Sequence, residues 1–179
     1  MYRLKSIELS LISEKPIDSI PNQEKLFRIA KRLLVSVDEA KDAMQEINIK
    51  WWQMPPEKKH ALQNVESYAV TMIKNYCLDH LKSREAQNLP VDESILTVAD
   101  EQGLAHRIEQ RDGLDWVSKL INTLPERERL IIQLREIENY EFSAIAQIVD
   151  LPETTVRVYL SRTRKKLRSQ YLKIDPHGI

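Results

Sequence analysis

The chain has 179 residues, and its 27 basic and 27 acidic side chains give a formal net charge of zero. Its composition, 42% hydrophobic and 30% charged, is that of a soluble globular protein and excludes a disordered or membrane-embedded chain. Because no apolar run approaches the roughly 20 residues of a membrane span, and no secretory signal core is present, we expect no membrane insertion.

The first half of the chain predicts helices, and the count of only three glycines in the sequence agrees with this. Residues 1–20 match no pattern and are assigned to an N-terminal arm. Apolar residues at helical spacing predict a first helix (Leu26, Ile29, Ala30, Leu33, Leu34) and a second (Ala40, Ala43, Met44, Ile47, Trp51). Ser36 or Asp38 can cap the second helix, and Pro55 and Pro56 end it before a loop. A third helix is predicted over about 65–84.

The second half begins after an acidic stretch with poor periodicity. Residues 90–112 carry two basic and six acidic side chains, and we interpret 87–111 as a flexible linker. Helical spacing returns at Leu114, and Pro125 suits the first turn of a following helix that is predicted to continue through Ile137. The sequence therefore predicts an all-α fold of two small helical domains, at 21–86 and 112–173.

Residues 142–160, "FSAIAQIVDLPETTVRVYL", have the pattern of a helix-turn-helix. Ala146 supplies the small residue needed where two helices cross closely. Asp150 stands at the turn position where glycine is usual, and Asp tolerates the left-handed conformation better than most residues. Five apolar residues fall where the two helices bury against each other (Ile145, Val149, Leu151, Val156, Leu160).

The second of these helices is strongly basic. Residues 153–179 carry seven basic and two acidic side chains. Although the net charge of the whole chain is zero, positive charge is therefore concentrated at its C-terminal end. An exposed helix with arginines on adjacent stripes can enter a DNA major groove, where some side chains read base edges and others hold phosphates. The competing interpretation is a solvated amphipathic helix. The preceding helix-turn-helix pattern favours DNA binding.

Two blocks of the sequence resemble one known family. "LPERERLIIQLREIENYEFSAIAQIVDLPETTVRVYLSRTRKKLR" resembles the promoter-reading C-terminal domain of extracytoplasmic-function (ECF) sigma factors, in the sigma-70 family. "FRIAKRLLVSVDEAKDAMQEINIKWW" and "SYAVTMIKNYCLDHLKSR" are similar to that family's N-terminal domain. The resemblance covers about residues 22–170 and implies a four-helix C-terminal domain. It also implies a bacterial sigma factor that binds core RNA polymerase through the β′ clamp and β flap, together with promoter DNA.

The resemblance implies roles for three groups of residues. Docking on the polymerase falls to an acidic face of the second helix (Asp38, Asp42, Gln45, Glu46). Recognition and melting of the −10 element fall to the third helix (Lys74, Asn75, Tyr76, Lys82, Arg84). The −35 element meets the basic helix (Thr155, Arg157, Val158, Ser161, Arg162, Arg164, Lys165). Asp150, Val158 and Tyr159 depart from the family pattern, so the −35 preference stays open. Tyr68, at the start of the −10 helix, and Asn48, whose change affects packing, depart from it in the N-terminal domain.

Two other functions compete with this interpretation. A stand-alone helix-turn-helix regulator would have no need of the acidic helix around 38–52. An enzyme is not expected, because the four histidines are scattered and no phosphate-binding glycine loop or nucleophile elbow is present. The single cysteine, Cys77, excludes an internal disulfide and a cysteine-rich zinc site, so we expect a cytoplasmic protein without metal or cofactor. An anti-sigma factor is a further candidate partner.

Overall fold

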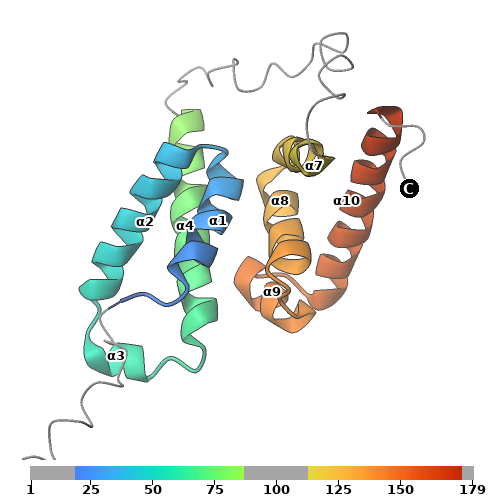
Figure 1. The fold of residues 1–179 in the computed structure, drawn as a ribbon. Coiled ribbons are helices and arrows are strands. Elements are labelled where there is room, and N and C mark those ends of the chain that lie inside the picture. Colours follow the sequence, from blue (N-terminus) through green and yellow to red (C-terminus); the bar gives the residue numbers. More distant parts are fainter. Residues whose placement is uncertain (1–18, 87–112, 175–179) are drawn as a thin grey trace, which may run out of the picture.

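The computed structural model describes residues 19–86 and 113–174, and the regular structure in these two ranges is helical (Figure 1). The N-terminal domain contains α1 (Gln23–Leu34), α2 (Val37–Trp52), α3 (Pro56–His60) and α4 (Val65–Ala86). The C-terminal domain contains α7 (Gly113–Asn122), α8 (Glu126–Ile132), the π-helical turn η2 (Gln133–Ile137), α9 (Phe142–Val149) and α10 (Glu153–Ile174). The predicted all-α fold with two domains is confirmed. The predicted linker, and all but the last two residues of the predicted arm, lie outside the described residues.

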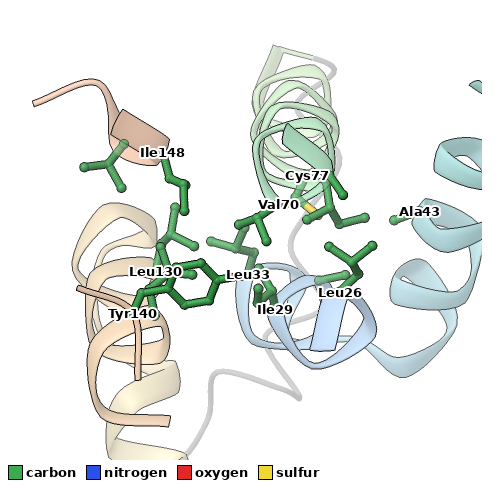
Figure 2. Packing of buried hydrophobic residues seen from close by; sticks show 14 of the residues in the cluster. Leu26, Ile29, Leu33, Ala43, Val70, Cys77, Leu130, Tyr140 and Ile148 are labelled. Carbon is green, nitrogen blue, oxygen red and sulfur yellow. The ribbon is translucent and has the colours of Figure 1, made fainter. Parts of the chain in front are cut away.

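Helix α1 is the centre of the N-terminal domain. It packs against α2 and α4, and on its other side it contacts α8 and η2 of the C-terminal domain. Its residues Leu26, Ile29, Ala30 and Leu33 are at most 1% exposed, because neighbours cover the helix on both sides. A single cluster of buried apolar side chains consequently runs through both domains (Figure 2).

Local capping fixes where the N-terminal helices begin. The Ser36 hydroxyl accepts a hydrogen bond from the Glu39 amide at 3.3 Å, which selects Ser36 over Asp38 as the cap of α2. Asn64 Oδ1 accepts from the Ser67 amide at 2.9 Å at the start of α4. The predicted loop after Pro55 and Pro56 was wrong in part, since Pro56 begins the short helix α3. Proline is favoured at a first helical position, where its missing N–H costs nothing.

The run Leu130 to Leu134 is buried at every residue, with each at most 2% exposed. A helix that is apolar all round is covered on several sides, and here α8 lies between α1 and α10 (Figure 1). The predicted helix does continue through Ile137, but its last five residues are π-helical and not α-helical. The backbone widens into η2, where the Glu138 amide donates to the Gln133 carbonyl at 3.0 Å, and Ile137 is 45% exposed.

Candidate nucleic-acid interface

Helices α9 and α10 form the helix-turn-helix that the sequence predicted. Asp150 ends α9 in the left-handed conformation, with φ 54° and ψ 55°, as expected for the residue that replaces the usual glycine. The Leu151 amide donates to the Ala146 carbonyl at 3.0 Å and closes the turn. The two helices bury Ile145, Val156 and Leu160, each at most 2% exposed. The apolar side of α10 is thus fixed against α9 and α8, and its other side faces solvent.

The solvent-facing side of α10 carries the residues assigned to the −35 element. Thr155 is half-buried near the start of the helix, and the other six are exposed (Arg157, Val158, Ser161, Arg162, Arg164, Lys165). The structure therefore brings this predicted set together on one face. Such a face is convex and basic, which suits a major groove lined by phosphates.

Two arginines at the flank of this face are held by neighbours. The Arg157 guanidinium lies 3.8 Å from the centre of the Phe142 ring and 3.2 Å from Glu153. Arg164 pairs with Glu136 at 2.6 Å. These contacts restrict the two side chains before any ligand binds, which lowers the entropy cost of a later phosphate contact. Phe142 was missed by the sequence analysis, and its signal was an aromatic residue at the start of the first helix of the motif.

The centre of the face differs from its flank. Helical periodicity places Arg157 and Arg164 on one stripe, and Val158, Ser161, Arg162 and Lys165 lie beside that stripe. None of these four makes an ion pair within the described part of the chain. Arg162 and Lys165 can therefore reorient toward bases or phosphates. Val158, 47% exposed, offers an apolar contact of the kind that a thymine methyl accepts.

Helix α2 presents a separate, acidic stripe. Asp38, Asp42, Gln45 and Glu46 are all exposed, and the only ion pair among them in the described residues joins Asp38 to Lys41 at 3.0 Å. Glu39 is not part of the stripe, because it turns toward α4 and accepts from Arg84 at 2.6 Å. The predicted docking residues therefore share one accessible, negatively charged surface.

Two apolar residues extend this stripe toward the end of α2. Ile49 is 49% exposed and Trp52 is 71% exposed, and both follow Gln45 at helical spacing. Neither residue was predicted as part of a site. The available signal was the pair Trp51–Trp52, since adjacent helical residues diverge and only one of the two can be buried. Trp51 is that one, at 3% exposure.

The five residues assigned to the −10 element are divided by the structure. Asn75 and Tyr76 line an open pocket of about 440 Å³ between α2 and α4, together with Ile47, Lys50, Met72, Asp79 and His80. Lys82 is exposed further along α4. Arg84 is bound to Glu39, as described above. Lys74 faces the C-terminal domain, where its ammonium donates to the Ile148 carbonyl at 2.7 Å, and burial lowers the pKa of this lysine.

Within the pocket the aromatic groups are stacked. The rings of Tyr76 and His80 are nearly parallel, with centres 6.3 Å apart and an interplanar angle of 10°. The Lys50 ammonium lies 5.4 Å from the centre of the Tyr76 ring. Burial, followed by the charges of Glu46 and Asp42, raises the pKa of Tyr76, so its hydroxyl stays protonated and can donate a hydrogen bond. Aromatic faces next to a cation are the elements that hold unstacked bases in single-strand binding sites.

Residues 19–86 and 113–174 contain neither a metal-binding cluster nor a membrane-spanning helix. No group of three or more His, Cys, Asp or Glu side chains there is close enough to hold a metal ion. None of the helices in those ranges is both long and apolar enough to cross a bilayer.

Comparison with known families decides between the two helix-turn-helix interpretations. The family described as "Sigma-70 region 2" matches this chain over residues 21–87, and the family described as "Sigma-70, region 4" matches it over residues 114–167. The chain belongs to the sigma-70 family. The region 4 match contains α8, α9 and the basic face of α10, and the region 2 match contains the acidic stripe and the pocket.

Relatives place this sigma-70 family chain in the ECF group. It is 27% identical over 116 residues to the ECF RNA polymerase sigma-E factors of Salmonella typhimurium, Escherichia coli and Shigella flexneri. Each match includes 65% of this chain and 58% of the relative, so the chain spans little more than half the length of these relatives. The fold also matches the sigma factor RpoE of Bartonella quintana, solved in complex with the anti-sigma factor NepR. That match has a TM-score of 0.62 and 21% identity, and covers 86% of this chain and 92% of the other.

Proposed function

We propose that this chain is a promoter-specificity subunit of bacterial RNA polymerase. In this role it docks on the core enzyme, reads a −35 and a −10 element and helps to open the duplex. One observation carries the proposal: an acidic exposed stripe on α2 and a basic exposed face on α10 occur on two domains that match sigma regions 2 and 4. The polymerase supplies the chemistry, and this chain supplies recognition.

Recognition of the −35 element falls to the centre of the α10 face. Arg162 and Lys165 carry the charge that neutralises phosphates or reads guanine edges, and Ser161 and Val158 contribute a hydroxyl and an apolar contact. The flanking Arg157 and Arg164, held by Phe142, Glu153 and Glu136, position the helix on the phosphate backbone. Concentrating the net positive charge on α10 also limits non-specific binding, which phosphate contacts dominate.

Recognition of the −10 element falls to the pocket between α2 and α4. An unstacked base can lie against the Tyr76 ring, with Asn75 offering both a donor and an acceptor to the base edge. Lys50 lines the same pocket and Lys82 is exposed further along α4, so both ammonium groups are available to the adjoining phosphate backbone. Unstacking costs a few kcal/mol per base, and stacking on an aromatic ring offsets about 1–3 kcal/mol of it.

Docking on the polymerase falls to the acidic stripe of α2. Asp42, Gln45 and Glu46 present two carboxylates and an amide on one exposed surface, which suits a basic partner such as the β′ clamp. Ile49 and Trp52 add an apolar end, and exposed aromatic residues are common anchors in protein interfaces. The β flap is the expected partner of the C-terminal domain, and an anti-sigma factor is a further partner by analogy with the NepR-bound relative. These roles imply a cytoplasmic location.

The alternative is a stand-alone helix-turn-helix regulator that binds duplex DNA unaided. Footprinting of candidate promoters with and without core polymerase separates the two functions. We expect protection of both promoter elements only when the core enzyme is present. Equal protection of a single duplex site by the purified chain alone would favour the regulator.

A further inference from the structure

One phenylalanine ring at the edge of the basic face contacts two arginines. The guanidinium carbon of Arg157 lies 3.8 Å from the centre of the Phe142 ring, and that of Arg135 lies 4.5 Å from the same point. Both distances are well inside the limit of a cation–π contact, which is about 6 Å. Arg157 belongs to the face of α10, whereas Arg135 lies in η2 and Phe142 begins α9. Three separate elements therefore meet at this ring.

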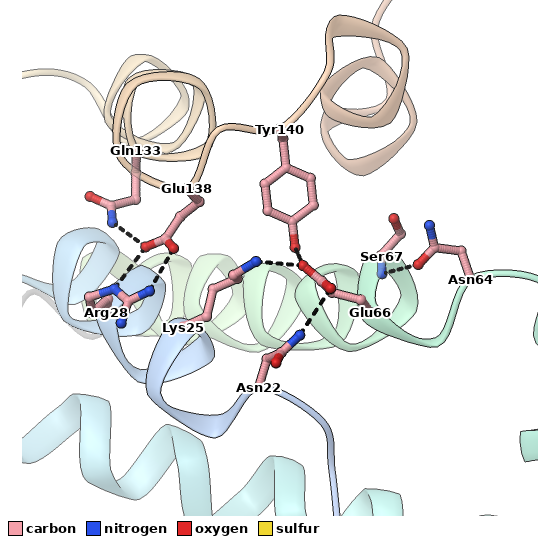
Figure 3. A network of polar contacts seen from close by, with 9 residues as sticks. All are labelled: Asn22, Lys25, Arg28, Asn64, Glu66, Ser67, Gln133, Glu138 and Tyr140. Atoms are coloured by element: carbon pink, nitrogen blue, oxygen red, sulfur yellow. Dashed lines mark hydrogen bonds and ion pairs between the residues drawn. The ribbon is translucent and has the colours of Figure 1, made fainter.

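The ring is held in place by the domain beneath it. Phe142 is half-buried and packs against the buried apolar cluster. On the side of η2, the Arg135 guanidinium donates to the Tyr140 carbonyl at 2.7 Å. η2 is closed in turn by its first residue, Gln133, which donates to the Glu138 carboxylate at 2.9 Å (Figure 3). The ring and η2 thus form a fixed support for the long side chains of α10.

The acidic partners of the two arginines are exposed, unlike the ring. Arg157 pairs with Glu153 at 3.2 Å and Arg135 pairs with Glu141 at 3.6 Å, and the side chains of these glutamates are 43% and 80% exposed. Ion pairs between exposed groups contribute little to stability. A phosphate can therefore displace either carboxylate while the guanidinium groups stay on the ring.

Two positive charges close to one ring repel each other. Both guanidinium carbons lie within 4.5 Å of one ring centre, and this repulsion is relieved when an anion binds near them. Charge-assisted hydrogen bonds from arginine suit a phosphate in particular. Phenylalanine has no hydrogen-bonding group in its side chain, so Phe142 cannot bind a phosphate itself. Its electrostatic influence on DNA binding must act through the two arginines.

We propose that Phe142 is a positioning residue for −35 recognition, which holds the guanidinium groups of Arg157 and Arg135 in one place for a phosphate of the promoter backbone. This inference rests on the proposed function. Ordering a free arginine side chain on binding reduces affinity, and a side chain already held by a ring has less freedom to lose. η2 also supplies Glu136, which binds Arg164 at 2.6 Å two turns further along α10. One support therefore orders both arginines at the flank of the basic face.

The contact with the ring can be tested first without DNA. In NMR spectra of the purified chain, the side-chain protons of Arg135 and Arg157 near the Phe142 ring should be shifted upfield by its ring current. Phe142→Leu should remove these shifts. Unshifted arginine resonances in the unmodified chain would overturn the proposal.

Replacing the Phe142 ring with a trifluorinated phenylalanine ring separates its electrostatic role from packing. Fluorine withdraws electron density from the ring face and nearly preserves the shape, so the cation–π contacts weaken while the packing remains. In fluorescence anisotropy on a promoter that the holoenzyme transcribes, we expect binding to weaken by about two- to fivefold, the value of one exposed cation–π contact. The loss should be equal for every −35 sequence, since a phosphate carries no sequence information. Phe142→Tyr keeps an electron-rich ring and should bind at least as tightly as the unmodified chain.

Salt dependence distinguishes positioning from loss of charge. Fluorination removes no charge, so the slope of affinity against salt should stay the same, whereas Arg157→Ala should reduce it by about 1. Unchanged affinity with the fluorinated ring, in an assay where Arg157→Ala weakens binding, would refute positioning by Phe142.

Phe27 provides a matched control. It is the other of the two phenylalanines in the chain, is half-buried in α1, and makes no cation–π contact within residues 19–86 and 113–174. The same fluorination at Phe27 should leave promoter binding unchanged, and an equal loss at both positions would also overturn the proposal. Absence of promoter complexes with the unmodified chain would instead refute the proposed function, and with it the role in promoter binding, even where NMR still shows the ring contact.

Discussion

Arg162→Ala offers the sharpest test of how α10 recognises DNA. The side chain is exposed at the centre of the basic face and makes no ion pair within the described residues, so its removal should change the free energy of unfolding by no more than about 0.5 kcal/mol. A lost bidentate contact to a guanine costs about 1–3 kcal/mol, which is roughly a 5- to 150-fold loss of affinity for the correct −35 sequence. Binding of the chain to core polymerase should not change.

The assay is fluorescence anisotropy of the reconstituted holoenzyme on promoters that differ only in the −35 element, repeated over a range of salt. Arg164→Ala is the matched control, because it removes the same charge from the flank, where Glu136 already binds it at 2.6 Å. We expect a smaller and sequence-independent loss for Arg164→Ala, with a salt slope reduced by about 1. Loss of core binding by Arg162→Ala, or equal losses for both variants on every sequence, would refute the assignment of this face.

Three further predictions address docking, burial and the turn. Asp42→Lys with Glu46→Lys should abolish core polymerase binding in gel filtration while leaving the circular dichroism spectrum intact, since both residues are exposed; normal binding would mean that docking lies elsewhere. Burial raises the pKa of the Cys77 thiol to about 12, so the thiol should be neutral at pH 8. It should therefore not react with iodoacetamide until denaturant unfolds the domain. Rapid mass gain in native buffer would contradict this. Asp150 has φ 54°, a left-handed conformation that glycine adopts at no cost and valine adopts poorly. In urea titrations Asp150→Gly should therefore raise the free energy of unfolding by roughly 0.5–1 kcal/mol, and Asp150→Val should lower it. The reverse order would refute the left-handed turn.

The sequence predicted those features that depend on local patterns. Apolar spacing located the helices, Ser36 was one of the two expected caps, and Asp150 adopts the left-handed conformation that its place in the motif demands. The basic and acidic faces were also predictable, because an exposed charged stripe needs only helical periodicity. In each case residues within four or five positions of one another decide the outcome.

Contacts between distant residues were not predictable in the same way. Arg28 and Glu138 are 110 positions apart, and as single charges each looks like an ordinary surface residue in the sequence. Lys74 was assigned to DNA because of its position on α4, and only the packing of α9 shows that it also has an intramolecular partner. The sequence does carry one signal of such contacts, the dense apolar run "LIIQL", which indicates a helix that is covered on several sides, and all five of its residues are buried.

Transcription reconstituted from purified components tests the central claim most directly. Core polymerase from a bacterium is combined with this chain and a library of promoter sequences, and the 5′ ends of the transcripts are sequenced. We expect transcripts that begin at defined positions and share −35 and −10 elements, and these should be lost with the docking variant Asp42→Lys, Glu46→Lys. The same start sites and yields with core enzyme alone would contradict the claim that this chain confers promoter specificity.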